Sequence, residues 1–357
     1  MSDLLYSAEE EALRAAVRDL LDDHCEVAGV IARADTAEPH DLALWRRLAD
    51  GMALAGLLVP EDRGGQGASP REAAVVLEEL GRAMAPVPFL TSAVVATEAL
   101  LACEAGDLLA ELAAGRRTGA LAVPLHVGPG AAHPHARLSG GTLHGELTGV
   151  ADATVADLLL VPADDGALYA VDADAVTVTP LTCLDPTRPL ATLTLEGAPG
   201  ERLGASGPAV RRALGTAAGL LASEQLGLAS WSLEETVRYL KERRQFGRPV
   251  GGFQAVKHRL ARLWLENVNL RAAARGAADA LATGEDTDTA VAVAQAYASG
   301  AAVHAAEEAL QLHGGIGMTW EHPAHLYLKR AKADSLAYGT AGAHREALAA
   351  LADLPAP

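Results

Sequence analysis

Two segments of the sequence combine residue types that suit a phosphate-bearing ligand. In the first, residues 238–261, a helical pattern ends in a basic run around Arg243, turns at residues 247–252 and resumes after Phe253 and Gln254. Guanidinium groups, free backbone amides and a helix N-terminus all bind pyrophosphate, and such a corner presents them together. A basic helix end can equally do no more than compensate the helix dipole.

The second segment, residues 311–323, begins with Gln311 and contains Gly314, Gly315 and Gly317. These glycines end a helical pattern and allow a ligand or another chain to approach the backbone closely. A Gly-Gly pair is also a common helix C-cap, so a purely structural interpretation stays open for this segment too.

Common catalytic and nucleotide-binding signatures are missing. The sequence has no GxxxxGK[ST], HExxH or GxSxG motif, and Gly128-Pro-Gly130 lacks the third glycine and the following helix of a dinucleotide fingerprint. His126, His133 and His135 fall in one loop between predicted strands, but no carboxylate or cysteine there completes a ligand set. We therefore expect solvated histidines and no metal.

Composition excludes several classes of partner. Hydrophobic residues are 50% and charged residues 21% of the 357, which excludes a disordered chain. The 46 acidic and 29 basic residues give a net charge of −17, so nucleic acid and anionic membrane surfaces are not expected partners. An acidic N-terminus and the lack of an apolar run of about 18 residues predict a cytoplasmic chain without membrane insertion.

Apolar periodicity predicts an α+β chain in three parts. Residues 1–118 show helical spacing with breakers at 60–67 and 86–88. Residues 119–206 contain six or seven short apolar or alternating runs separated by Gly, Pro and Asp, and residues 207–357 return to long helical runs. We expect a helical domain, a compact β-domain and a helical bundle, in that order.

Together and in this order, the two glycine-containing segments resemble the paired signatures of the acyl-CoA dehydrogenase family. A turn like that of the family also runs from Val59 to Gly67, and the resemblance covers essentially the whole chain. It implies an N-terminal helical domain, a middle domain that is a small β-barrel or sandwich, and a C-terminal four-helix bundle. It also implies FAD as the cofactor, lying across a subunit interface.

The half of the flavin site that each subunit offers to its neighbour is complete in this sequence. The resemblance implies that Arg243 binds the pyrophosphate of the neighbour's FAD, with Gln245 and Phe246 beside it. The residues expected along the ADP portion also match: Gln254, Gln311, Gly314 and Gly315.

The half that each subunit offers to its own flavin matches badly. The family's Thr-Glu-Pro…Gly-Ser loop after the first β-strand corresponds to residues 120–130, which contain no Thr, Glu or Ser. The family's aromatic-aliphatic-threonine triplet, which stacks on the flavin, corresponds to Gly149-Val150-Ala151. Neither a ring nor a hydroxyl remains there.

Dehydrogenation α,β to a thioester needs a carboxylate that takes the α-proton while hydride leaves the β-carbon for flavin N5. An ungapped count from Gly317 places Tyr338 at the family's base position. A phenol with an ordinary pKa of about 10 is a poor base at neutral pH. Some members carry the glutamate on the first long C-terminal helix, but that place falls here at Ala217 or Ala218. Glu224, two turns further on, is either a relocated base or a helix-pairing residue.

This division predicts one chain of a heteromeric enzyme without a catalytic residue of its own. A sister acyl-CoA dehydrogenase subunit would bring the base, and this chain would complete its FAD site. Similar pairs occur among actinobacterial enzymes of sterol side-chain degradation, which are α2β2 heterotetramers, and residues 86–89 and 184–188 also resemble that subgroup. The implied substrate is an acyl-CoA thioester, and an electron-transfer flavoprotein is a candidate electron acceptor.

Two alternatives stay open. A self-sufficient homomeric acyl-CoA or acyl-carrier-protein dehydrogenase could use Tyr338 or Glu224 as an unusual base. A flavin-free scaffold could have kept only the dimer surface, although the intact segment from Arg243 to Gln254 counts against it.

Overall fold

Short helices make up the N-terminal part and pack around one apolar core. The structure is a computed structural model and describes residues 4–354. Two helices begin with a capping box, in which a serine side chain and a glutamate three residues on cap each other's backbone: Ser7 with Glu10, and Ser69 with Glu72. The elements are α1 (Ala8–His24), α2 (Val27–Ala34), α3 (Leu42–Arg46), η1 (Arg47–Gly51), η2 (Leu54–Gly56), η3 (Glu61–Arg63), α4 (Pro70–Ala83), η4 (Phe89–Ala96), α5 (Thr97–Ala102) and α6 (Gly106–Ala113).

Two four-stranded sheets follow, with the strand orders β1-β4-β5-β8 and β2-β3-β7-β6. On β4, Leu159 and Val161 pack against the second sheet, whereas Leu158 and Leu160 join the core of the helical part. The first sheet is therefore buried on both faces. The strands are β1 (Gly119–Leu121), β2 (Arg137–Ser139), β3 (Thr142–Ala151), β4 (Leu158–Pro162), β5 (Ala167–Asp172), β6 (Thr177–Pro180), β7 (Leu190–Ala198) and β8 (Glu201–Ala205).

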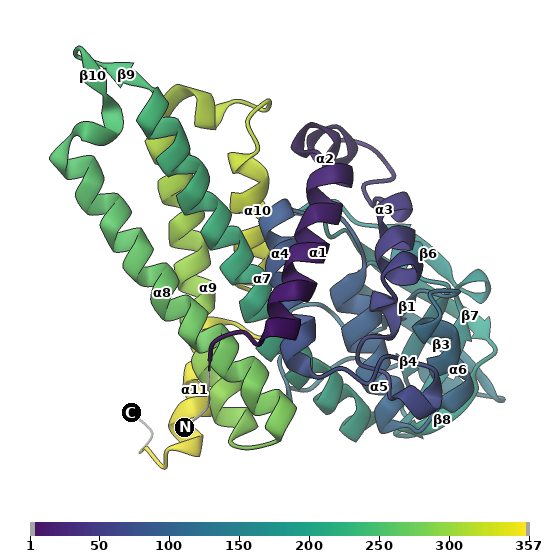
Figure 1. The fold of residues 1–357 in the computed structure, drawn as a ribbon. Helices are drawn as coiled ribbons and strands as arrows, with labels where there is room; N and C mark the ends of the chain where they lie inside the picture. The colour runs from purple at the N-terminus through teal and green to yellow at the C-terminus, as the bar shows by residue number, and fades with distance from the viewer. Residues whose placement is uncertain (1–3, 355–357) are drawn as a thin grey trace.

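Long helices form a bundle in the C-terminal part (Figure 1). The longest, α7, packs against α4 of the N-terminal part as well as against α8 and α9 of the bundle. Both α10 and α11 lie against α9. The elements are α7 (Ser206–Glu242), η7 (Val250–Gly252), α8 (Gln254–Thr283), α9 (Thr287–His313), η8 (Gly314–Met318), α10 (Ala324–Asp334) and α11 (Ala341–Leu351).

The helices α4 and α7 cross at two glycines. A Cβ atom on Gly81 would lie 2.3 Å from the carbonyl oxygen of Glu224, and one on Gly227 would lie 2.0 Å from the carbonyl oxygen of Glu78. Only glycine allows backbones to approach so closely. The crossing fixes α7, and with it Glu224, against the N-terminal part.

The predicted fold of a helical domain, a small β-barrel or sandwich domain and a helical bundle is confirmed, and the middle domain consists of two sheets. The sequence analysis missed β8, because its residues are mostly exposed and show no apolar alternation. Within residues 4–354, no helix is both long and apolar enough to span a bilayer.

Candidate functional site

A projecting hairpin joins α7 to α8 and carries several of the predicted flavin-binding residues (Figure 1). Its strands are β9 (Arg244–Gln245) and β10 (Arg248–Pro249). Phe246 and Gly247 form the turn between them, with φ of 52° and 77°, as a two-residue type I′ hairpin requires. We call residues 243–253 the arm.

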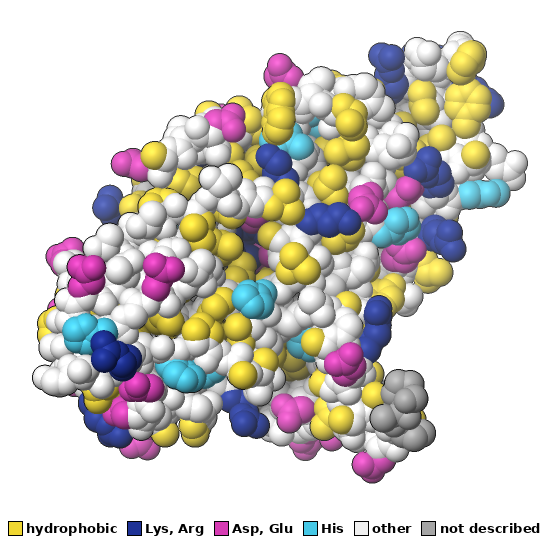
Figure 2. All heavy atoms as spheres, turned by 180° about the vertical axis from the view of Figure 1, so that it is seen from behind, with side chains coloured by type: hydrophobic (Ala, Val, Ile, Leu, Met, Phe, Trp, Pro, Cys, Tyr) yellow, Lys and Arg dark blue, Asp and Glu magenta, His cyan; other side chains and the backbone are white. Residues whose placement is uncertain are grey.

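The arm exposes a ring and several cations. Phe246 is 89% exposed, in a left-handed conformation that is uncommon for an aromatic residue. Its ring packs edge-on against Phe253, and the guanidinium of Arg248 lies 3.9 Å from the Phe253 ring centre. Arg243 and Gln245 are also exposed. Basic and hydrophobic side chains gather at this tip, at the upper right of Figure 2. The type I′ turn accounts for the positive φ and places the Phe246 ring at the exposed tip of the arm.

The second predicted segment lies at the same end of the bundle. Tyr239, one turn before the arm, stacks on His313, the last residue of α9, with ring centres 4.6 Å apart. Arg259 pairs with Glu308 at 2.6 Å, which holds the start of α8 beside the end of α9. The structure therefore brings to one end, all exposed, the predicted site residues Arg243, Gln245, Phe246, Gln254, Gln311, Gly314 and Gly315.

The two segments that lack the expected flavin contacts also meet, in space, the segment that lacks the expected base. The backbone N–H of Leu125 donates to the carbonyl oxygen of Gly149 at 2.9 Å, and the N–H of Tyr338 donates to that of Leu125 at 2.7 Å. A Cβ atom on Gly339 would lie 3.4 Å from the Cα of Gly128. We call these segments the Tyr338 cluster: residues 120–130, 149–151 and 338–340.

Tyr338 is buried, and only a very small cavity adjoins its side chain. The residue is 3% exposed and lines a cavity of about 20 Å³, whose other walls include Val95, Leu121 and Leu214. Such a volume holds about one water molecule. Burial raises the pKa of Tyr338 well above its ordinary value, although the charge of Arg188 opposes the shift. A buried neutral phenol in this setting is a poor acceptor for a substrate proton.

A larger pocket of about 640 Å³ lies beside the cluster. Residues 126–132, the first turn of α9 and α11 line it, with Arg211, Thr340 and His344 among its polar groups. Among the described residues that line this pocket there is no Phe, Tyr or Trp, so they offer no large aromatic ring to stack on a flavin.

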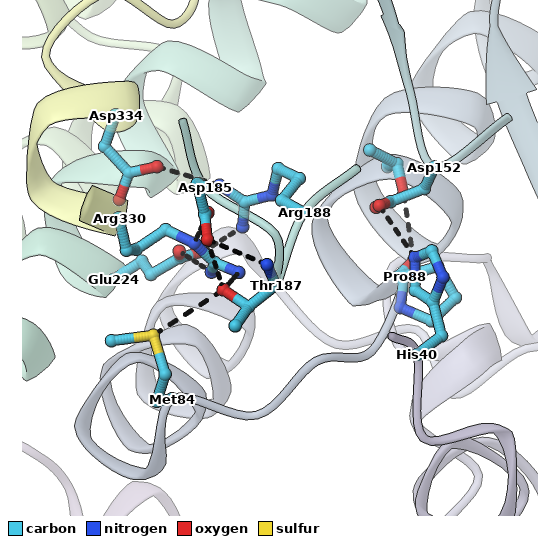
Figure 3. Close-up of polar contacts among 11 residues, drawn as sticks. His40, Met84, Pro88, Asp152, Asp185, Thr187, Arg188, Glu224, Arg330 and Asp334 are labelled. Atoms are coloured by element: carbon cyan, nitrogen blue, oxygen red, sulfur yellow. Dashed lines mark hydrogen bonds and ion pairs between the residues drawn. The ribbon is translucent and has the colours of Figure 1, made fainter. Parts of the chain in front are cut away.

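Glu224 is held as a counter-ion (Figure 3). It is 2% exposed, and its two carboxylate oxygens accept hydrogen bonds from Arg188 and Arg330, each at 2.6 Å. Burial alone would raise the pKa of Glu224, but the two arginines outweigh burial and lower it. A carboxylate whose oxygens are both occupied cannot reach a substrate. The geometry therefore favours the helix-pairing role and goes against the relocated base.

Two more acids complete this buried cluster. Asp185 accepts a hydrogen bond from Arg330, and Asp334 accepts one from Arg188 at 2.9 Å. Within the described residues, Oδ2 of Asp334 has no hydrogen-bond partner. Burial and the charge of Glu224 raise the pKa of Asp334 well above its ordinary value, which favours its neutral form in a group of three acids and two cations. We call this the ionic network: Asp185, Arg188, Glu224, Arg330 and Asp334.

The sequence analysis missed the ionic network. Arg188 stands out in the sequence only as part of a turn, and Arg330 and Asp334 look like ordinary polar residues of α10. A signal was present: the two lie four residues apart on the helix face that carries Leu326 and Tyr327, so an apolar stripe includes an opposite-charge pair.

Comparisons with known proteins decide the family. The model of the acyl-CoA dehydrogenase N-terminal domain matches residues 7–104, and that of the C-terminal domain matches residues 207–352. The chain belongs to the acyl-CoA dehydrogenase family. The family is one of flavin-dependent oxidoreductases, as the sequence analysis predicted.

Several relatives of this acyl-CoA dehydrogenase chain come from mycobacteria. Acyl-CoA dehydrogenase IpdE2 of Mycolicibacterium smegmatis is 37% identical over 328 residues, which are 91% of this chain and 93% of that protein. A chain of the ChsE4-ChsE5 complex of Mycobacterium tuberculosis has a TM-score of 0.88 and 30% identity, covering 99% of this chain and 100% of that one. A chain of a variant of the Tcur3481-Tcur3483 steroid acyl-CoA dehydrogenase has a TM-score of 0.85 and 33% identity, and the match covers 97% of this chain and 98% of that one. The resemblance to the actinobacterial heteromeric type is thereby confirmed.

FAD is the cofactor of this family; a glutaryl-CoA dehydrogenase of the same fold, with a TM-score of 0.86 and 21% identity, was solved with FADH2. The residues of this chain fit one part of that cofactor. The exposed Arg243 and the turn at Gly314 and Gly315 offer a guanidinium and accessible amides, which suit a pyrophosphate. The Tyr338 cluster fits the flavin ring poorly, because residues 120–130 supply no hydroxyl or carboxylate side chain.

Proposed function

We propose that this chain is the flavin-completing, non-catalytic subunit of a heteromeric acyl-CoA dehydrogenase. One contrast carries the proposal. The arm and the turn at Gly314 stand exposed at one end of the bundle, whereas Tyr338 is buried behind a cavity of about 20 Å³. A chain that exposes cofactor-binding residues at its surface but has no base near its own flavin site depends on a second subunit to remove the substrate proton.

In this proposal FAD, when bound, would supply the hydride acceptor for dehydrogenation of the thioester, and a carboxylate of the sister subunit would serve as the base for the α-proton. The residues of this chain bind and orient the cofactor. Arg243 would neutralise the pyrophosphate of FAD, and the exposed Phe246 would lie beside it together with Gln245. Gln254 and Gln311 donate and accept hydrogen bonds along the ADP portion.

The geometry disfavours the homomeric alternative. That alternative requires Tyr338 or Glu224 to take a proton. Tyr338 is buried and its pKa is raised, and both carboxylate oxygens of Glu224 accept hydrogen bonds from arginines. The flavin-free scaffold is disfavoured for a different reason. Such a protein has no need for an exposed aromatic residue at positive φ beside a run of arginines.

We infer a steroid-derived acyl-CoA thioester as the substrate of the complex, with an electron-transfer flavoprotein as a candidate acceptor. The support for the substrate is the likeness to a steroid acyl-CoA dehydrogenase at 33% identity over 97% of this chain. A panel of thioesters with steroid, branched and straight acyl groups, assayed on the assembled complex, tests this inference. Faster turnover of a straight-chain thioester would contradict it.

The central test is to produce the chain alone and together with a sister acyl-CoA dehydrogenase chain, and to measure flavin absorbance per chain after size exclusion. We expect a colourless lone chain and a complex with about one FAD per two chains. A lone chain that holds FAD and is bleached by an acyl-CoA would establish the homomeric alternative instead.

A matched pair of variants locates the cofactor contact. Arg243→Ala should weaken FAD binding by the complex about tenfold or more, since a charge-assisted contact contributes about 1.5–3 kcal/mol. Arg202→Ala is the control, because Arg202 is an arginine of β8 whose side chain is 62% exposed. Equal FAD affinities of the two variants would remove Arg243 from the site.

A further inference from the structure

Three side chains from different segments of the bundle meet beside the arm. They are Glu235 on α7, His313 at the end of α9 and His322 in the loop before α10. One ligand atom of each lies within 4.8 Å of those of the other two. Two imidazoles and one carboxylate are the protein ligands of many zinc sites that keep an open fourth position.

His313 is arranged as a metal ligand. It is 3% exposed, and the centre of its ring lies 4.6 Å from that of Tyr239 and 4.4 Å from that of His322. Its Nδ1 donates to the carbonyl oxygen of Ala309 at 2.6 Å, which leaves the lone pair on Nε2. Among the residues that the structure describes, this buried Nε2 has no hydrogen-bond partner. Metal-ligating histidines show the same arrangement, with one nitrogen fixed by a carbonyl and the other directed to the ion.

The other two ligands each give up a contact when the metal binds. Arg238 donates to both carboxylate oxygens of Glu235, from Nε at 2.8 Å and from Nη2 at 2.5 Å. Unlike the buried arginines around Glu224, Arg238 is 59% exposed and also lies 3.3 Å from Glu242, so a metal ion can displace it to that partner. Nδ1 of His322 accepts a long hydrogen bond of 3.3 Å from the N–H of Ala324. Binding through Nε2 moves the ring proton to Nδ1 and gives up this long contact.

We propose that Glu235, His313 and His322 bind a zinc ion, with a water molecule as the fourth ligand. Imidazole and carboxylate ligands in a four-coordinate site suit Zn²⁺. The ion would tie the end of α7 to the turn η8, which carries Gly314 and Gly315. The proposal goes beyond the flavin function and does not depend on it, because all three protein ligands belong to this chain.

The test uses the metal-free full chain, titrated with Co²⁺ as a spectroscopic probe and then with Zn²⁺. We expect visible d–d bands of a tetrahedral site, displacement by about one Zn²⁺ per chain, and a higher Tm with zinc. Glu235→Gln and His322→Gln should each weaken binding at least about tenfold, as loss of a ligand does. Both residues are half-buried, so these variants threaten the fold less than a change at His313.

His135→Gln is the control, because His135 is an exposed loop histidine with no part in the site. It should bind Co²⁺ and Zn²⁺ as the unaltered chain does. Absence of the tetrahedral bands in the unaltered chain would overturn the proposal. So would unchanged metal affinity in both Glu235→Gln and His322→Gln, because binding would then belong to surface histidines elsewhere.

Discussion

Oε1 of Glu224 lies 2.6 Å from Nη1 of Arg330, and both side chains are 3% exposed. The pair joins α7, at the point where it crosses α4, to the helix that ends four residues before Tyr338. The loop between β6 and β7 is held by the same charges through Asp185 and Arg188. The ionic network therefore fixes the three parts of the chain around the Tyr338 cluster.

Neutralising two acids of this network should have opposite consequences. Glu224→Gln removes the ionised partner of two buried arginines, so it should lower the free energy of unfolding by about 3–5 kcal/mol. Asp334→Asn removes a carboxyl whose raised pKa makes its ionised form costly to bury, so it should leave that free energy unchanged or raise it. Urea unfolding at neutral pH measures both. Equal losses in the two variants would mean that Asp334 is ionised in the folded chain.

The same two acids predict how stability depends on pH. The raised pKa of Asp334 means that the folded chain binds more protons than the unfolded one from about pH 4 upward, so this contribution to stability is lost as pH rises. The lowered pKa of Glu224 has the opposite sign, since its contribution is present above about pH 4.3 and is lost as pH falls. The Tm measured across pH should therefore have a maximum and fall both toward acid and toward alkaline pH. Asp334→Asn should flatten the decline toward high pH and leave the acid side unchanged.

Sequence reasoning reached the helical and strand patterns because apolar spacing decides them, as in β4, where Leu158 to Val161 are all buried. It also placed the arm, since Arg243 and Gln254 lie close together along the chain. It did not find the ionic network or the group around His313, because such contacts join residues up to 146 positions apart, as from Arg188 to Asp334. No local period marks a pairing of that kind; only the packing of α7, α9 and α10 creates it.

The close crossing of α4 and α7 predicts a large effect for one methyl group. Gly227→Ala would place a Cβ atom 2.0 Å from the carbonyl oxygen of Glu78, so the helices must separate. We expect a loss of about 3 kcal/mol or more in the free energy of unfolding, as for overpacked cores. Gly215→Ala on the same helix is the control. Nothing lies within 4 Å of its added Cβ, and alanine there should stabilise by up to about 1 kcal/mol.

Tyr338 occupies the base position of the family, and its hydroxyl should not matter for turnover. Tyr338→Phe keeps the buried ring and removes only the hydroxyl, so the assembled complex should retain its kcat and kcat/KM within about twofold. Steady-state kinetics of the complex with an acyl-CoA substrate provides the measurement. A fall of about 100-fold in kcat with FAD content unchanged would instead identify Tyr338 as a catalytic base.

Phe246 offers a way to separate the shape of the arm from the contact that its ring makes. Phe246→Asn creates an Asn-Gly pair, the favoured sequence for a type I′ turn, so the hairpin should form at least as well as before. The substitution removes the ring, which is 89% exposed in this chain, and with it any contact that the ring makes with the sister subunit or FAD. Burial of a phenylalanine contributes about 1.5–3 kcal/mol, so FAD should dissociate from the complex about tenfold faster or more. Flavin fluorescence after dilution measures that rate. An unchanged rate would show that the arm acts through its backbone and cations, and that the aromatic ring has another role.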